Sequence, residues 1–337
     1  MQTGKRLWAL TCCMLMIFLP TAQAAQPLES GTPMTLTTPS AILAETATTV
    51  IFEKNADERR EVASITKLMT ALLVLEALDR EEIALTDSVQ ISPRAAAMKG
   101  SQALLDASAV YPLEDLLRTT IKASANDSAV ALSEYIAGSE ENFVDRMNRR
   151  AAELGMTNTN YVNCTGYPQS GQYTTARDVC RLCCEIAKHP RYNQYASVWI
   201  DKLTHPGGRV TDLTNTNRLV RFYEGCDGYK TGSTDAAKYC LAATAEKNGM
   251  RLVAIVLGTP VSQTRFNEAR QMLDYGFATY RRVVIANKGD LLGQNVEVRG
   301  GSAESVPLAL GSGLSMLLKN GQQSGFWKRP SGILRGN

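Results

Sequence analysis

The sequence predicts an α+β fold in which strands from both ends of one domain form a single antiparallel sheet, flanked by helices and a helical lobe. Two short β-type runs, residues 40–45 and 48–54, open the domain. A helical pattern covers residues 64–80, and several more lie within residues 93–190. From residue 225 the chain returns to β-type runs, followed by a helix over residues 264–282. Strands on both sides of a helical middle favour this layout, because the early and late strands can share one sheet.

Local signals support the main elements. Residues 64–80 are apolar all round and predict a buried central helix. Residues 238–247 and 250–259 flank Asn248-Gly249, the strongest short-range signal for a β-hairpin. In the middle, Pro112 and Gly138 bound helical patterns, as expected for residues that start and stop helices.

The two ends of the chain differ from the middle. Lys5 and Arg6 precede a short apolar run, and Ala22-Gln23-Ala24 follows it, so residues 1–24 are interpreted as a signal peptide. The Thr- and Pro-rich residues that come next are interpreted as a linker. The last segment is Gly- and Ser-rich, with two β-like pieces, and no helix in it is expected to have the apolar face and length of a membrane anchor. We therefore expect an exported protein without a firm membrane anchor. The expected parts are residues 1–24, 25–39, 40–283 and 284–337.

Composition excludes several classes of protein. The 337 residues are 44% hydrophobic and 20% charged, which indicates a folded core and excludes a disordered chain. Lys and Arg total 36 against 33 Asp and Glu, so a strongly basic nucleic-acid-binding protein is excluded on charge. Only His189 and His205 are present, so neither a His-rich metal site nor a Ser-His-Asp triad is expected, and no metal or cofactor is predicted.

Six cysteines follow the signal peptide, and an even number in an exported protein raises the possibility of disulfides. Cys180, Cys183 and Cys184 fall on one predicted helix, where the geometry for a disulfide is poor. The interpretation we favour is that the six are small apolar core residues, and a structural disulfide stays open as the alternative.

Three short clusters could carry chemistry. In Ser64-Ile65-Thr66-Lys67 the spacing places Lys67 beside Ser64 on a helix, where a neutral lysine could take the proton of a serine nucleophile. A lysine that is mostly neutral near pH 7 needs a pKa about 3 units below its usual value, and burial can supply part of that shift. The alternative is an ordinary capping serine followed by an exposed lysine.

The second cluster, Ser124-Ala125-Asn126, lies at a break between two helices, and taken alone it is interpreted as a helix cap. The third, Lys230-Thr231-Gly232, enters a strand. There Lys230 could meet a substrate carboxylate, Thr231 could offer a hydroxyl, and Gly232 could let a ligand approach the backbone. The alternative for Lys230 is an edge-strand lysine near a turn.

The order S-x-x-K, S-x-N, K-T-G is much more specific than any one cluster, and it is characteristic of penicillin-binding proteins and class A β-lactamases. The chain resembles the low-molecular-mass penicillin-binding proteins that are serine-type D-alanyl-D-alanine carboxypeptidases, with their transpeptidase-like fold. The resemblance covers about residues 40–283. It is carried by residues 52–78, 100–117, 124–144, 171–178, 226–259 and 264–277.

The resemblance implies roles for nine residues. Ser64 would be acylated, Lys67 would be its general base, and Ser124 would relay a proton to the leaving D-alanine. Asn126, Lys230, Thr231 and Gly232 would hold the substrate, the backbone N–H groups of Ser64 and Ser233 would bind the oxyanion, and Arg265 would bind the terminal carboxylate. By the same resemblance, residues 284–337 correspond to a shortened C-terminal β domain.

The implied function is removal of the terminal D-alanine from peptidoglycan stem pentapeptides, with β-lactams as covalent inhibitors. Two alternatives stay open: a β-lactamase of similar fold, and a non-catalytic peptidoglycan-binding protein. Against the first, no Glu-x-x-Leu-Asn segment lies between Ser124 and Lys230, where a class A enzyme would carry its deacylating glutamate.

Overall fold

The computed structural model describes residues 34–46, 49–298 and 305–322. The expected signal peptide, most of the expected linker and the basic end of the chain lie outside these residues. Among the described residues, no helix combines the length and the apolar character needed to cross a membrane.

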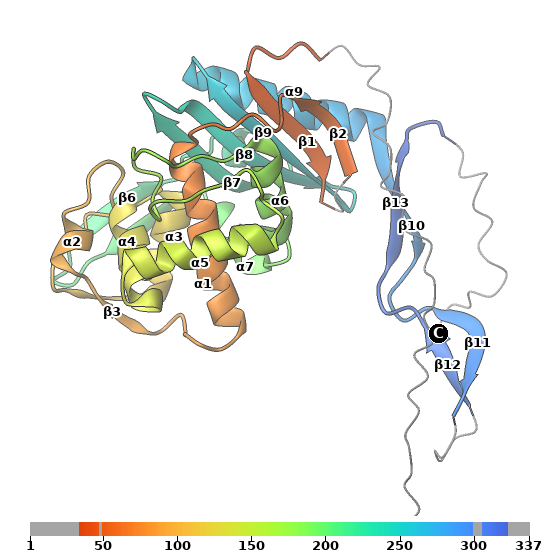
Figure 1. Ribbon diagram of the computed structural model, residues 1–337, viewed down its shortest axis with the longest axis horizontal. Helices are drawn as coiled ribbons and strands as arrows, with labels where there is room; N and C mark the ends of the chain where they lie inside the picture. The colour runs from red at the N-terminus through yellow and green to blue at the C-terminus, as the bar shows by residue number, and fades with distance from the viewer. Residues whose placement is uncertain (1–33, 47–48, 299–304, 323–337) are drawn as a thin grey trace, which may run out of the picture.

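A five-stranded sheet forms the centre of the molecule (Figure 1). It has the strand order β2-β1-β9-β8-β7 and is antiparallel throughout. The predicted sharing of one sheet by early and late strands is confirmed, because β1 pairs with β9 and Leu43 lies opposite Ala254. The strands are β1 (Ser40–Glu45), β2 (Thr49–Lys54), β7 (Cys226–Thr234), β8 (Lys238–Lys247) and β9 (Met250–Thr259).

The turn between β8 and β9 is the one that the sequence predicts. Asn248 and Gly249 both have positive φ, 53° and 71°. Two consecutive left-handed residues match the twist of the flanking strands, and Asn-Gly adopts this conformation at low cost. β7 lies at the edge of the sheet, so within the part of the chain that the structure describes one side of this strand has no neighbouring strand.

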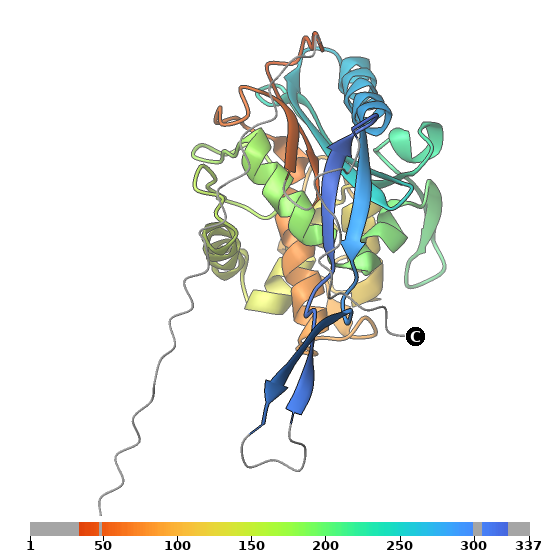
Figure 2. The ribbon, with the colours of Figure 1, turned by 90° about the vertical axis from the view of Figure 1, so that its right-hand side faces the viewer.

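Helices cover both faces of the sheet (Figures 1 and 2). In β1, Ile42 and Ala44 pack into the core beneath the helical lobe, whereas Ala41 and Leu43 pack into a second core under α9. This alternation follows from the two-residue period of a strand. The helices are η1 (Ala63–Thr66, a 3₁₀ helix), α1 (Lys67–Asp79), α2 (Pro93–Ala96), α3 (Leu113–Lys122), α4 (Asn126–Ala137), α5 (Glu140–Glu153), α6 (Ala176–Ile186), α7 (Pro190–Ala196), α8 (Leu219–Phe222) and α9 (Ser262–Thr279).

The helix expected over residues 64–80 is present, with its first turn wound as the 3₁₀ helix η1. Leu68, Met69 and Leu72 of α1 are fully buried, as expected for a central helix. Two antiparallel strand pairs lie on the helical lobe. β3 (Ser88–Gln90) pairs with β4 (Val110–Pro112) across a long segment that contains α2, and β5 (Ile200–Thr204) forms a hairpin with β6 (Val210–Thr214).

The C-terminal segment forms two strand pairs beside the body of the molecule, which Figure 2 views from that side. β10 (Tyr280–Ala286) pairs with β13 (Leu314–Lys319), and β11 (Leu291–Glu297) pairs with β12 (Ser305–Ala309). The helix expected to reach residue 282 ends at Thr279, and β10 begins at once. The expected domain boundary at residue 283 therefore lies within a strand.

All six cysteines after the expected signal peptide are free thiols in the structure. Five are buried and Cys184 is partly exposed. The interpretation of these residues as core side chains is confirmed. Burial raises the pKa of Cys183 well above its usual value, so this thiol is a poor nucleophile.

Candidate active site

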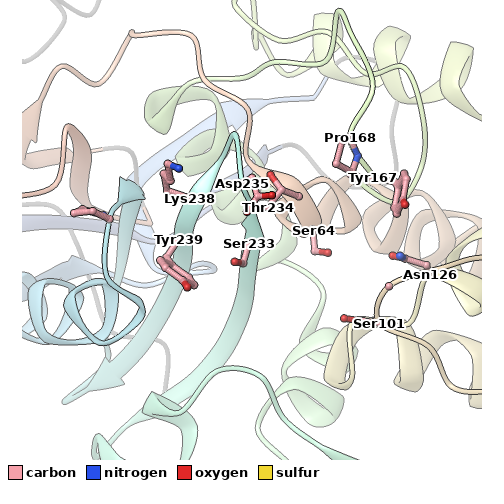
Figure 3. Close-up of a pocket in the computed structure, with 13 residues that line it drawn as sticks. Ser64, Ser101, Asn126, Tyr167, Pro168, Ser233, Thr234, Asp235, Lys238 and Tyr239 are labelled. Atoms are coloured by element: carbon pink, nitrogen blue, oxygen red, sulfur yellow. The ribbon is translucent and has the colours of Figure 1, made fainter.

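A pocket of about 600 Å³ lies where the sheet edge meets the helical lobe (Figure 3). Ser64 lies between its two sides: β7 and the turn that follows it form one side, and the loop residue Tyr167 with Asn126 forms the other. The lining residues are Ser64, Gly100, Ser101, Asn126, Gly166, Tyr167, Pro168, Ser233, Thr234, Asp235, Lys238, Tyr239 and Pro260.

Ser64 and Lys67 lie side by side, as the i, i+3 spacing predicts. Lys67 is 1% exposed, and its Nζ lies 3.1 Å from Ser64 Oγ. The same nitrogen donates hydrogen bonds to Asn126 Oδ1 at 2.6 Å and to the carbonyl oxygen of Thr165 at 2.7 Å. A neutral amine has two hydrogens and one lone pair. With both hydrogens on these oxygens, the lone pair is left for the Ser64 hydroxyl.

The electrostatics favour that neutral form. Burial lowers the pKa of Lys67 from 10.5 to about 7, and Cys164 and Asp127 oppose this shift only in part. Burial also lowers the pKa of Lys230, and the positive charges of Lys67 and Arg265 lower it further. Near neutral pH the Lys67 amine is therefore available both with and without its proton, which suits a group that must take up and release one.

Asn126 begins α4 and joins the two halves of the pocket wall. Besides accepting from Lys67, its Nδ2 donates to the carbonyl oxygen of Lys99 at 2.6 Å, and its backbone N–H donates to the carbonyl oxygen of Ser101 at 2.7 Å. These bonds still leave one amide hydrogen and an acceptor site on Oδ1. Ser124 lies in the break between α3 and α4, with a φ of 62° and 3% exposure.

Asp127, next to Asn126, is a positioning residue that sequence reasoning missed. It is fully buried and accepts hydrogen bonds from the N–H groups of Ala103 at 2.9 Å and Leu105 at 3.1 Å. It thereby fixes the loop that supplies Gly100 and Ser101 to the pocket. Its place in the first turn of a helix was a weak signal, since acidic residues are favoured there in any helix.

The K-T-G cluster lies on β7 along the edge of the sheet. Lys230 is 1% exposed, and its Nζ donates to the carbonyl oxygen of Thr231 at 3.0 Å. Thr231 is 6% exposed, and Ser233 lines the pocket itself. The cluster is therefore buried at its start and opens into the pocket at its end, so Lys230 is not the exposed edge lysine of the alternative reading.

Two glycines allow the segment that carries Ser64 to pack closely against its neighbours. A Cβ added at Gly232 would lie 2.2 Å from the carbonyl oxygen of Val62, and one added at Gly166 would lie 1.9 Å from that of Ala63. Any larger residue would push η1 away from its neighbours. The space that a side chain at position 232 would take is thus filled by the protein's own backbone, and close approach of a ligand to Gly232 stays a prediction. Gly166 gave no signal in the sequence.

Arg265 is the fourth residue of α9 and lies against the ends of β7 and β8. Its Nη1 donates to the carbonyl oxygens of Gly232 at 3.1 Å and Cys240 at 3.3 Å, and its Nη2 donates to Ser262 Oγ at 3.3 Å. Arg265 is 9% exposed and does not line the pocket in the described structure. It ties α9 to the ends of β7 and β8, beside the strand that carries Lys230.

A group of side chains away from the pocket has the residue types of a metal site. Among the described residues, Glu76, Glu185 and His189 lie close enough to share an ion. Arg150 already occupies both carboxylates, at 2.8 and 3.1 Å, and His189 Nδ1 faces Asp79 at 2.7 Å. All three side chains are therefore already engaged by other protein groups, and they lie outside the pocket.

Comparison with known proteins identifies the fold and the family. The model of the D-alanyl-D-alanine carboxypeptidase family matches residues 23–261. The chain belongs to this family. Carboxypeptidase DacF of Bacillus subtilis is 37% identical over 310 residues, which are 92% of this chain and 79% of the relative.

Solved structures of penicillin-binding proteins agree with this membership in the carboxypeptidase family. Penicillin-binding protein 5 of Haemophilus influenzae superposes with a TM-score of 0.78 at 30% identity, covering 87% of this chain and 86% of that one. Penicillin-binding protein D2 of Listeria monocytogenes, in its ampicillin-bound form, superposes with a TM-score of 0.65 at 30% identity, covering 73% of this chain and all of that one. The expected penicillin-binding-protein fold and serine peptidase class are confirmed.

Proposed function

We propose that this carboxypeptidase removes the terminal D-alanine from peptidoglycan stem pentapeptides through an acyl-enzyme on Ser64. The observation that carries the proposal is the buried Lys67 amine, 3.1 Å from Ser64 Oγ and with a pKa near 7. A serine hydroxyl needs a base to become an effective nucleophile. The Lys67 amine lies within reach of the hydroxyl and is partly unprotonated near pH 7, so it can act as that base.

The proposed reaction begins at this pair of residues. Lys67 takes the proton of Ser64, whose Oγ attacks the carbonyl carbon of the penultimate D-alanine. Backbone N–H groups of Ser64 and Ser233 stabilise the negative oxygen that forms. Ser124 relays a proton to the leaving amine as the peptide bond breaks. Water then attacks the ester, Ser64 recovers its proton, and the shortened peptide leaves.

The remaining site residues bind the substrate. Asn126 keeps one amide hydrogen for a substrate carbonyl, and Thr231 offers its hydroxyl. Lys230 gains a favourable partner when a substrate carboxylate enters, because its burial and its positive neighbours leave the protonated amine poorly stabilised without one. Gly232 serves by letting η1 pack closely against β7.

Labelled penicillin separates this proposal from its alternatives. We expect wild-type protein to form a stable adduct that the Ser64→Ala variant does not form, together with release of D-alanine from a pentapeptide. Rapid turnover of the adduct would instead indicate a β-lactamase. Absence of both adduct and D-alanine release, in a protein that still binds peptidoglycan, would indicate a non-catalytic binding protein.

Replacing Arg265 by alanine tests how the free carboxylate is recognised. Hydrogen bonds to charged groups contribute about 1.5 to 3 kcal/mol, so kcat/KM on a peptide ending in D-Ala-D-Ala should fall roughly 10- to 150-fold. The same peptide with an amidated end offers no carboxylate and should be little affected. Arg270→Ala, an exposed arginine on the same helix, is the matched control.

The contacts of Arg265 also allow a purely structural role. Because Arg265 donates to the carbonyls of Gly232 and Cys240, it could simply brace the sheet edge. Equal losses on the acid and amide peptides would show that bracing role and would remove Arg265 from carboxylate recognition.

The proposal places the enzyme outside the cytoplasmic membrane, where its substrate is found. The expected signal peptide over residues 1–24 supports this location and lies outside the described residues. β-Lactams are proposed as covalent inhibitors, supported by the ampicillin-bound relative.

A further inference from the structure

The turn after β7 carries two charged residues into the pocket. Thr234 pairs with Lys238, so the turn has three residues, Asp235 to Ala237, and the N–H of Ala237 donates to Thr234 Oγ1 at 3.0 Å. Lys238 has a φ of 53°, the left-handed conformation that closes such a turn and that glycine or asparagine adopts more easily. The left-handed conformation is unfavourable for a lysine, and in this conformation Lys238 lies at the rim of the pocket.

Asp235 and Lys238 are the only charged residues among those that line the pocket in the described structure. They lie on the same side of it, opposite Tyr167 and Asn126 (Figure 3). Within the described residues, neither side chain forms an ion pair or a hydrogen bond, whereas at the other end of β7 Asp227 is paired with Arg251 at 2.7 Å. Both charges of the turn are therefore free to meet a ligand.

The proposed function sets the direction in which a substrate lies, and the inference rests on it. The leaving D-alanine and its carboxylate lie toward Lys230 and Thr231, at the start of the cluster. The carbonyl under attack lies at Ser233. The rest of the peptide must then continue past Ser233 along the free edge of β7, toward the turn. An extended chain advances about 3.3 Å per residue, so the residue before the two D-alanines reaches the Asp235–Lys238 region.

We propose that Asp235 and Lys238 form a subsite for the side chain of that residue. Asp235 binds its terminal ammonium group and Lys238 binds a carboxylate on the same terminal carbon. The enzyme then prefers a substrate with a diamino-dicarboxylic residue such as 2,6-diaminopimelate at this position. A substrate with lysine at the same position ranks second, and one with a neutral side chain ranks third.

Three peptides that differ only at this residue test the subsite: diaminopimelate, lysine and Nε-acetyl-lysine, each followed by D-Ala-D-Ala. For wild-type enzyme, kcat/KM should fall at each step by about 3- to 10-fold, the range for a partly solvated charged pair. Asp235→Asn should bring the ratio of lysine to acetyl-lysine peptide close to one. Lys238→Gln should do the same to the ratio of diaminopimelate to lysine peptide.

Asp212→Asn and Lys202→Gln are the matched controls. Both residues are exposed on the β5–β6 hairpin, and neither lines the pocket. Both should retain the wild-type ratios. Equal kcat/KM on the three peptides for wild-type enzyme, or ratios that the Asp235 and Lys238 variants leave unchanged, would overturn the subsite. Failure of the wild type to form a penicillin adduct and to release D-alanine from any peptide would instead overturn the proposed function, and the subsite with it.

Discussion

Acylation of Ser64 by penicillin should fall by about 10²- to 10⁴-fold when Lys67 is replaced by arginine, the range for loss of a general base. Arginine keeps the positive charge but effectively never releases its proton. It therefore cannot supply the lone pair that the Lys67 amine directs at Ser64 Oγ. The measurement is the rate of adduct formation with labelled penicillin.

The pH profile provides a second readout for the same residue. The pKa of Lys67 is lowered to about 7, so the wild-type rate should drop as pH falls through 7 and the amine takes up its proton. A Lys67→Arg variant should show no such step. Lys67→Met, which buries no charge, checks that the loss is not caused by unfolding, and Lys202→Arg on the surface is the neutral control. Near-normal acylation in a folded Lys67→Arg variant would refute the role of this lysine.

Alanine at Gly166 should lower acylation by about 10²-fold or more, although residue 166 donates no group to the reaction. Its Cβ would lie 1.9 Å from the carbonyl oxygen of Ala63 and 2.9 Å from Thr66 Oγ1, so η1 and the Ser64 that it carries must shift. Displacement of a reacting group by about 1 Å can reduce a rate 10²-fold.

Gly171 provides a closely matched control for this prediction. It has a φ of 90°, against 77° for Gly166, so alanine pays a similar conformational cost at both positions. A Cβ at Gly171 meets only Val162 Cγ1, at an ordinary 3.7 Å. If Gly166→Ala and Gly171→Ala acylate at the same rate, contact with Ala63 does not position Ser64.

The sequence predicts those parts of the structure that depend on neighbours along the chain. The Asn248-Gly249 turn fixes the pairing of β8 with β9, and the three-residue spacing brings Lys67 to Ser64. The lowering of the Lys67 pKa has burial as its main cause, and the apolar composition of α1 indicates that burial.

What the sequence does not predict depends on contacts between distant segments. Glu140 accepts the N–H of Cys164 at 2.9 Å and pairs with Arg94, and so supports the segment whose Thr165 carbonyl holds Lys67. Nothing in the sequence around Glu140 connects it to residue 165. In the same way, the sequence predicts too late an end for α9, because Tyr280 leaves the helix to pair with Lys319, which lies 39 positions further along the chain.

The buried thiol of Cys164 can report on local opening of the segment that contains it. Burial and the Glu140 carboxylate raise the pKa of Cys164, so a thiol reagent can modify it only when its segment opens to solvent. Its neighbour Thr165 accepts a hydrogen bond from Lys67. The rate at which Cys164 becomes labelled therefore reports how often this segment opens and Lys67 loses its hydrogen bond to Thr165. Those events can be followed in the unmodified sequence, with no probe introduced near the active serine.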